Sequence, residues 1–515
     1  MAAAAFASLP ELVRCLAEQT RSRKQLARLS RTNKTFHLAV APVLFREVVC
    51  LTDETLNALA NCAHLGHVRL LEVRLRHGEG EPANKIVQQM LPRMPLLEGF
   101  CWNAALATTT LTVLHRSCPE LKSIRFGMPC EFGSRYLGYS EDREYSNEPS
   151  AKELEAREIY GRPDLTVFRG LEELTLDNLC EELPWWRETI VEVLKNSPEL
   201  KKLGLSLSVA TIGKAARYGE RDTFDGFFYD VCNDFCAAGA PPLHLQSLKC
   251  GTAIIPDDAE SLQSLTDLTY LEEVHIENET VWNLMDVITM YEDGEESGIA
   301  FDALGPAQCP NLRRLTVSQY RGDVHELFAA SDDPAWARQV ALSFVEVNDA
   351  LEPAQLLRPS DKYPSLPLHL RMLDVNLDRE KVEVDDEEGG EVPTVAEVLH
   401  DLVAGDDGAL EGLSVHFPLD MGHDSFSDLL QAVTDILPGL INLTQLSVVL
   451  PGQFDNFDGK VESTARKLAG APSQVRYVKV QKRAWRVWRD GDGTVRLEEL
   501  EDREISDVEL FSQLL

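Results

Sequence analysis

A six-residue apolar pattern recurs along most of the chain and constrains its fold more than any other feature. The pattern is Leu-x-x-Leu-x-Leu with conservative replacements, and it returns from residue 70 almost to the end of the 515-residue sequence. Its twelve copies begin at Leu70, Leu97, Leu121, Leu171, Leu200, Leu245, Leu271, Leu312, Leu370, Leu410, Leu443 and Val475. This recurrence predicts a repeat architecture, because each copy offers the same small apolar face to its neighbours.

Each copy has the spacing of a short, one-sided β-strand. The fourth and sixth positions are two residues apart, so in a strand they point to one face. One such strand cannot bury that face alone, whereas parallel strands joined by helical returns bury a continuous core. Apolar residues at three- and four-residue steps predict such returns at Ile190 to Asn196, Leu429 to Leu437 and Ser463 to Leu468. Prolines such as Pro95 and Pro198 end the returns and favour an extended start to the next copy.

This combination resembles the leucine-rich-repeat family over about 410 residues. The resemblance implies an α/β solenoid of parallel strands with helical returns, which we place at residues 51–480. Neighbouring copies start 24 residues apart at the closest (97 to 121) and 58 apart at the widest (312 to 370), against the family's usual ~20–29. The asparagine that recurs in each repeat of the family is also missing: Leu179, Ser208 and Glu279 stand at three of the positions where it is expected. We therefore expect a divergent solenoid with exposed acidic loops at Glu131 to Pro149 and Val382 to Val392.

Residues 9–46 carry a second pattern, that of a small helical module. Leu9, Leu12, Val13 and Leu16 form one apolar stripe at helical spacing, and Pro10 suits the first turn of that helix. Three later residues, Leu26, Leu29 and Phe36, continue the apolar pattern on further helices. We predict an all-α module at residues 1–50.

The module resembles the F-box, in the divergent form that precedes leucine-rich repeats in many fungal proteins. The matching segments are Leu9-Pro10-Glu11-Leu12, then Leu26-Ala27-Arg28-Leu29-Ser30-Arg31 with Phe36, and Pro42-Val43-Leu44-Phe45-Arg46. The resemblance implies that Leu9, Pro10, Leu12, Leu16, Leu26, Leu29 and Phe36 bind the Skp adaptor of an SCF-type (Skp, cullin, F-box) ubiquitin ligase. The repeats would then present a client protein to the cullin ligase. A plain cap that shields the first repeat from solvent is the alternative interpretation of the module.

Two functions of different kinds follow. The first is the substrate-recognition subunit of an SCF-type ligase, and the alternative is a leucine-rich-repeat scaffold or inhibitor with no link to ubiquitin. In either case the default binding surface is the concave face, which in such solenoids carries the third, fifth and seventh positions of each copy. Those positions include Glu173, Thr175, Asp177, Lys202, Gly204, Ser206, Glu273, His275, Glu277, Arg314, Thr316 and Ser318.

The overall charge restricts the partners. The chain has a net charge of −34, with 84 acidic and 50 basic residues, and such a surface repels the phosphates of nucleic acids. Residues 1–50 differ, because they hold eight basic against three acidic residues. We expect a basic head on an acidic body, with protein partners and neither nucleic acid nor membrane, since no stretch has the ~18 apolar residues of a span.

No pattern of an enzyme, a cofactor or a metal site is found. The sequence has no phosphate-binding loop, dinucleotide motif, zinc-protease motif or nucleophile elbow. The eleven cysteines have the distribution of reduced core thiols, and we expect this for Cys232 and Cys236 too, because no second pair follows at zinc spacing. Reduced thiols favour the cytoplasm or the nucleus.

The C-terminal residues 481–515 are predicted to form a capping hairpin and a tail. The acidic, glycine-containing segment Asp490 to Gly493 lies between two apolar runs and is typical of a hairpin turn rather than a calcium loop. Trp485 and Trp488 are three residues apart, so on one strand they face opposite sides and one stays exposed.

Overall fold

The computed structural model of the chain divides into two compact units. Unit 1 comprises residues 1–271 with 280–297, and unit 2 comprises 272–279 with 298–515. The structure describes residues 10–20, 23–75, 80–103, 106–127, 164–179, 183–207, 226–251, 259–276, 304–319, 336, 339–346, 370–376, 410–417, 423–450, 458–471, 473–490, 494–500, 505, 508 and 510. The predicted acidic loops at 131–149 and 382–392 lie outside these residues.

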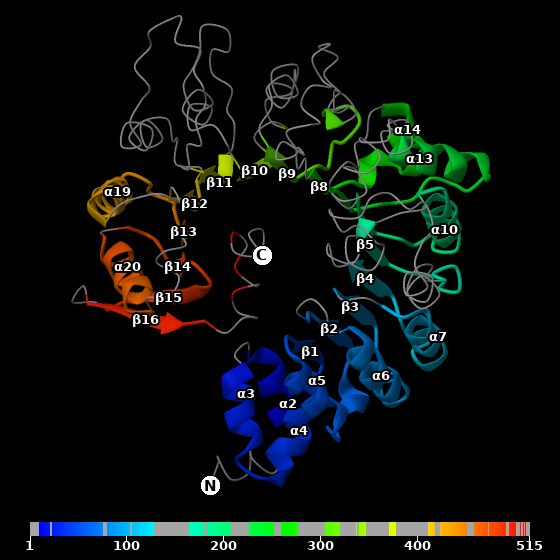
Figure 1. The fold of residues 1–515 in the computed structure, drawn as a ribbon, viewed down its shortest axis with the longest axis horizontal. Coiled ribbons are helices and arrows are strands. Elements are labelled where there is room, and N and C mark those ends of the chain that lie inside the picture. The colour runs from blue at the N-terminus through cyan, green and yellow to red at the C-terminus, as the bar shows by residue number, and fades with distance from the viewer. Residues whose placement is uncertain are drawn as a thin grey trace, which may run out of the picture. The chain divides into compact units, whose positions relative to one another are not determined.

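Unit 1 is mixed α/β, with parallel strands that pair in chain order (Figure 1). The strands are β1 (Glu47–Cys50), β2 (Leu70–Val73), β3 (Gly99–Trp102), β4 (Ser123–Gly127), β5 (Glu173–Leu179), β6 (Lys202–Leu207) and β7 (Ser247–Cys250). The helices that follow these strands are α5 (Asp53–Ala60), α6 (Gly80–Met90), α7 (Thr108–Ser117), α10 (Leu183–Lys195), α13 (Phe227–Ala237) and α14 (Ala259–Leu265). Short 3-10 turns follow at η1 (Leu65–His67), η2 (Leu91–Arg93) and η3 (Leu268–Tyr270).

Three further helices precede β1 and form a small core of their own. They are α2 (Pro10–Gln19), α3 (Arg23–Ser30) and α4 (Lys34–Leu44). Val13, Ala17, Leu26, Ala39 and Val40 make the buried cluster that joins them. The predicted helical module is therefore present. Its boundary was placed too late, because β1 already begins at Glu47 and pairs with β2.

Unit 2 continues the same alternation. Its parallel strands are β8 (Glu273–Ile276), β9 (Arg314–Gln319), β10 (Ala341–Glu346), β11 (Leu370–Asn376), β12 (Gly412–His416), β13 (Gln445–Val449) and β14 (Tyr477–Val480). Helices α19 (His423–Ile436) and α20 (Asp458–Gly470) follow β12 and β13. With α10, these two helices confirm the helical returns predicted from the sequence.

Two antiparallel strands end the sheet of unit 2. They are β15 (Arg483–Arg489), which pairs with β14, and β16 (Val495–Glu499), which pairs with β15. The predicted hairpin is confirmed, and Trp485 is buried while Trp488 is 51% exposed. The indole nitrogen of Trp488 donates to Glu498 Oε2 at 3.0 Å, so this ring is held within the hairpin.

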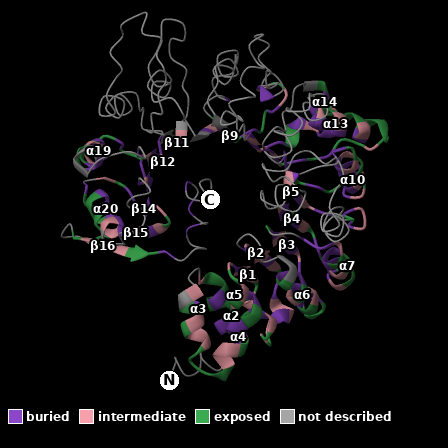
Figure 2. Ribbon diagram, viewed as in Figure 1, coloured by how far each residue is buried: buried purple, intermediate pink, exposed green. Residues whose placement is uncertain are grey.

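All twelve copies of the apolar pattern fall on strands, and the first, fourth and sixth positions form the core. In the copy at Leu171, for example, Leu171, Leu174 and Leu176 are at most 1% exposed. Buried residues run along the strands of both units (Figure 2). Each such leucine contributes roughly 1.5–3 kcal/mol relative to an exposed one.

The structure corrects the frame of one copy and adds two strands. Leu70 pairs with Gly99 and Leu71 with Phe100, so the copy assigned to Leu70 starts at Val68, whose side chain is fully buried. Strand β1 was missed because its copy starts at Phe45, inside the helical module. Strand β10 was missed because its copy of the pattern starts with Gln339 in place of a leucine. This copy lies between those at Leu312 and Leu370, which have the widest spacing.

The prolines act through turns. The backbone N–H of Leu97 donates to the carbonyl of Met94, and those of Leu121, Leu200 and Leu312 donate to Cys118, Ser197 and Cys309 in the same way. A proline occupies the second position of each of these four-residue turns, where its fixed φ is favourable. The prolines therefore close a tight turn between helix and strand.

Candidate functional site

In both units the helices cover one face of the sheet, and the third, fifth and seventh positions lie on the other (Figure 1). We call the second face the free face; it is the surface predicted to bind a partner. Because side chains alternate along a strand, charged residues can gather there without disturbing the core.

The free face of unit 1 carries a charged cluster from several strands. Arg125 of β4 lies 3.6 Å from Asp177 of β5, and Lys249 of β7 lies 3.6 Å from the same carboxylate. On the other side, Glu72 of β2 pairs with Arg74. We call these five residues the charged cluster. All five stand at third, fifth or seventh positions of their copies, where the sequence predicts the binding face, although only Asp177 was named there individually.

Gly204 makes one of these contacts possible. It lies on β6 between Thr175 of β5 and Lys249 of β7, with which it is in register. A Cβ atom at Gly204 would lie 2.9 Å from Thr175 Cγ2. The missing side chain leaves room for Lys249 to reach Asp177 across β6.

The electrostatics of the cluster favour contact with polar groups. Burial acts to lower the pKa of Arg125, but its acidic neighbours, Asp177 before Cys101 and Glu72, outweigh it and the pKa is raised. The Oδ1 atom of Asp177 is buried and makes no hydrogen bond to any residue that the structure describes. Its charge is met by Lys249 Nζ, which lies 3.6 Å from the same oxygen.

Nucleophilic chemistry is disfavoured at the same place. Burial, followed by the charge of Glu72, raises the pKa of the Cys101 thiol to about 12, and a thiol that stays protonated is a poor nucleophile. Burial likewise raises the pKa of Cys118, Cys250 and Cys309 to about 12.

Within the described ranges no group of three or more His, Cys, Asp or Glu residues could hold a metal ion. Cys232 is buried as expected, but Cys236 is exposed and is no core thiol.

Not every predicted free-face residue can meet a partner. Thr175, Ser206 and Thr316 are buried, and the Ser206 hydroxyl accepts a hydrogen bond from the backbone N–H of Asn178 at 2.9 Å. The hydrogen bond of Ser206 links β5 to β6, and burial leaves all three residues little surface for a partner, which corrects their assignment as contact residues. Glu277 lies outside the described residues, and the side chain of Ser318 is not described. Glu173, Lys202, Glu273, His275 and Arg314 remain at least partly exposed.

In unit 2 the chain covers part of its own free face. Ile505, Val508 and Leu510 form a buried cluster with Met372, Ala484 and Leu500. The backbone N–H of Leu510 donates to Gln445 Oε1 at 2.8 Å. A Cβ atom at Gly412 would lie 3.5 Å from Leu510 Cβ, so Leu510 lies over β12.

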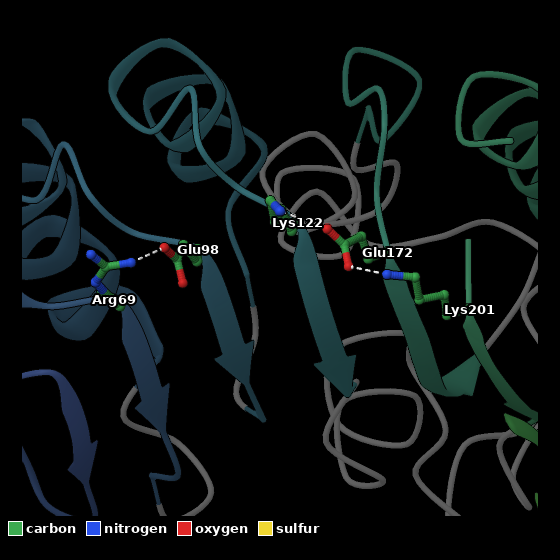
Figure 3. Close-up of polar contacts among 5 residues, drawn as sticks. All are labelled: Arg69, Glu98, Lys122, Glu172 and Lys201. Atoms are coloured by element: carbon green, nitrogen blue, oxygen red, sulfur yellow. Dashed lines mark hydrogen bonds and ion pairs between the residues drawn. The ribbon is translucent and has the colours of Figure 1, made fainter. Parts of the chain in front are cut away.

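The second position of each copy forms a charge ladder beside the strands. In unit 1 its residues are Arg46, Arg69, Glu98, Lys122, Glu172, Lys201 and Gln246, and each carbonyl except the last accepts the backbone N–H groups of the next copy. Glu172 accepts from Lys122 at 2.6 Å and from Lys201 at 2.7 Å, and Arg69 pairs with Glu98 (Figure 3). Hydrogen bonds from Lys122 and Lys201 lower the pKa of Glu172 to about 2.

The helical module presents two leucines outward. Leu12 and Leu16 are 44% and 42% exposed, while Val13 and Ala17 on the same helix are fully buried. Pro10 is exposed, and Leu29 and Phe36 are half-buried against the cluster. Leu26 is buried, so it supports the module from within and offers no direct contact. Leu9 lies outside the described residues.

The module is attached to the first strands through histidines. His37 of α4 lies 3.0 Å from His64, Nε2 to Nε2, and the His64 ring stacks on Phe45. Burial, then the nearby His37 and His67, lowers the pKa of His64. Arg23 of α3 also donates to the carbonyls of Leu44 and Glu47. These contacts hold the module against β1 and η1.

Comparison with known proteins gives no assignment: no family model matches the chain, and no curated protein is similar to it. No helix among the described residues is both long enough and apolar enough to cross a membrane.

Proposed function

We propose that the chain is the substrate-recognition subunit of an SCF-type ubiquitin ligase. In this proposal α2, α3 and α4 are an F-box that docks on the Skp adaptor. The strands and helices that follow form a divergent leucine-rich-repeat solenoid that binds the client protein. The proposal rests on the order of the two parts, on their fold and on the surfaces that each part leaves exposed.

The exposed leucines of α2 are the observation that carries the proposal. Leu12 and Leu16 are four residues apart, so they lie side by side on one face of the helix. The module does not need them for its own core, since Val13 and Ala17 fill that place. Together they form a small apolar patch, and burying it against another surface would be favourable.

The client is assigned to the free face of unit 1. The charged cluster offers three cations and two carboxylates over strands β2 to β7, and such mixed charge complements the polar surface of another protein. The Arg125 side chain, which is 50% exposed, is the best-defined contact point. A non-catalytic subunit of this kind accelerates ubiquitin transfer by raising the local concentration of the client near the loaded conjugating enzyme.

Adaptor binding is tested by co-purification. We expect full-length protein with Leu12→Asp and Leu16→Asp to lose the Skp adaptor, because two charges on the docking surface would be desolvated. The circular dichroism spectrum should remain unchanged. Ile441→Asp places the same change on a 62% exposed aliphatic residue of unit 2 and should retain the adaptor.

Retention of the adaptor by the double variant would reject the F-box assignment. If the wild-type protein binds no adaptor at all, the module is a cap and the chain is a scaffold or inhibitor. The burial of Leu26 and the packing of Leu29 and Phe36 are compatible with that second function, because they make the module self-contained.

A further inference from the structure

A groove lies in unit 1 where the helical module meets the first strands. It has a volume of about 410 Å³. Its lining residues are Arg14, Glu18, Pro42, Val43, Arg46, His67, Arg69 and Leu96. Three arginines and a histidine therefore face one carboxylate, in a chain whose net charge is −34. The groove is a local exception to the acidic character of the protein.

Two of the arginines have ion-pair partners, and the third has none among the residues that the structure describes. Arg14 Nε lies 3.0 Å from Glu18 Oε1, and Arg69 pairs with Glu98. The Arg46 side chain is exposed and makes no hydrogen bond or ion pair with any other described residue. Arg46 is thus the uncompensated charge of the groove.

The charge ladder shows what is missing next to Arg46. The backbone N–H groups of Arg69 and Leu70 donate to the carbonyl of Arg46, so Arg46 and Arg69 are neighbouring members of the ladder. From Arg69 to Lys201 each neighbour has the opposite sign: Arg69, Glu98, Lys122, Glu172, Lys201. Only Arg46 and Arg69 place like charges side by side among the ladder residues that the structure describes. An anion in the groove would restore the alternation at this step.

We propose that this groove binds an acidic peptide segment of a partner protein. The carboxylates of the peptide lie between Arg46 and Arg69, with Arg14 and His67 at the margins. Pro42, Val43 and Leu96 supply an apolar side, and Leu96 is 43% exposed, so an aliphatic side chain next to the carboxylates packs there. The volume is at the lower end of the ~300–1,000 Å³ of ligand pockets, which fits a few side chains and not a whole helix.

Fluorescence anisotropy with full-length protein tests the proposal. The probe is a labelled peptide of alternating glutamate and leucine residues, and its control is the same peptide with glutamine for glutamate. We expect binding of the glutamate peptide only, weakened several-fold when salt is raised from about 50 to about 300 mM, because screening acts on exposed charges.

The decisive variant is Arg46→Glu, which places a carboxylate of the chain itself beside Arg69. We expect it to weaken peptide binding at least about tenfold, through lost attraction and added repulsion, while thermal stability is kept or slightly raised. Arg116→Glu makes the same charge change on α7, at an exposed residue outside the groove. This control should bind the peptide as the wild type does.

Other outcomes overturn the proposal. Equal binding by Arg46→Glu, or by the glutamine peptide, would show that the groove does not recognise acidic residues. Displacement of the peptide by an equal concentration of inorganic phosphate would make the groove a site for small anions instead. The variant with Leu12→Asp and Leu16→Asp should still bind the peptide, so failure of adaptor docking and failure of this site are distinguishable.

Discussion

The free faces of the two units are both built from the third, fifth and seventh positions of the pattern and reach opposite results. In unit 1 these positions hold Glu72, Arg125 and Asp177, whose charges stay in contact with solvent. In unit 2 they hold Met372 and Gly412, and the chain's own Leu510 packs over them. The charged residues stand at fifth and seventh positions of unit 1, whereas the covered Met372 and Gly412 stand at third positions of unit 2. Charged groups resist an apolar cover, whereas a methionine and a glycine accept one.

Truncating Leu510, which covers the free face of unit 2, should have the largest effect on stability. Leu510→Ala leaves a cavity over β12, and we expect the free energy of unfolding of unit 2 to fall by about 2–5 kcal/mol. Hydrogen exchange across β12 and β13, together with urea unfolding, measures this loss. Ile441→Ala changes a 62% exposed side chain and should stay within about 0.5 kcal/mol of the wild type. A loss as small as this for Leu510→Ala would mean that the cover contributes nothing.

Replacing a glycine by alanine on either free face should have the next largest effect on stability, and each loss should be confined to its own unit. In Gly204→Ala the new Cβ lies 2.9 Å from Thr175 Cγ2, and in Gly412→Ala it lies 2.9 Å from Met372 Sδ. We expect each to lower stability by about 1–3 kcal/mol through overpacking. Exchange should rise near β5 to β7 for Gly204→Ala and near β11 to β13 for Gly412→Ala. The control is Gly470→Ala, where nothing lies within 4 Å; a similar loss there would contradict a local clash as the cause.

Substitutions in the charge ladder should have the smallest effect on stability, and the effect should be similar in the two units. Glu172 bridges two lysines in unit 1, and Glu411 pairs with Arg371 at 2.9 Å in unit 2. We expect Glu172→Gln and Glu411→Gln each to cost less than about 1 kcal/mol, because water screens exposed ion pairs. Thermal unfolding measures both.

The pH dependence of Glu172 follows from its lowered pKa. Its contribution to stability is complete above 4.5, the ordinary pKa, and is lost as the pH falls through about 2. The difference between Glu172→Gln and the wild type should therefore shrink over this range. A constant difference down to pH 2 would show that the lysines do not hold the carboxylate.

The strands could be predicted well because their signal is local and repeated. Each copy carries its buried positions within six residues, so Leu174 and Leu176 identify a strand without knowledge of the rest. The frame at Leu70 was less certain, because Val68, Leu70, Leu71 and Val73 satisfy the pattern in two ways. Strand β10 carried only part of the signal: Leu342 and Phe344 stand at the fourth and sixth positions, but Gln339 replaces the first leucine.

The candidate site was predicted less well, because it depends on contacts between distant residues. Nothing near Thr175 or Ser206 tells that they are buried between strands. Ile505, Val508 and Leu510 are separate apolar residues in an acidic stretch, with no periodicity that points to β12. The groove combines α2, α4 and the starts of β2 and β3, so it appears only once the module is packed on the strands.

The alternation of the charge ladder also restricts how a chain of this kind can change length. Loss of the copy that carries Glu98 would set Arg69 beside Lys122, and duplication of one copy would likewise put two equal charges next to each other. Loss of Glu98 and Lys122 together sets Arg69 beside Glu172, and the alternation survives. Between Arg69 and Lys201 the electrostatic penalty is therefore smallest when copies are gained or lost in pairs. The ladder thus favours a change in length by an even number of copies.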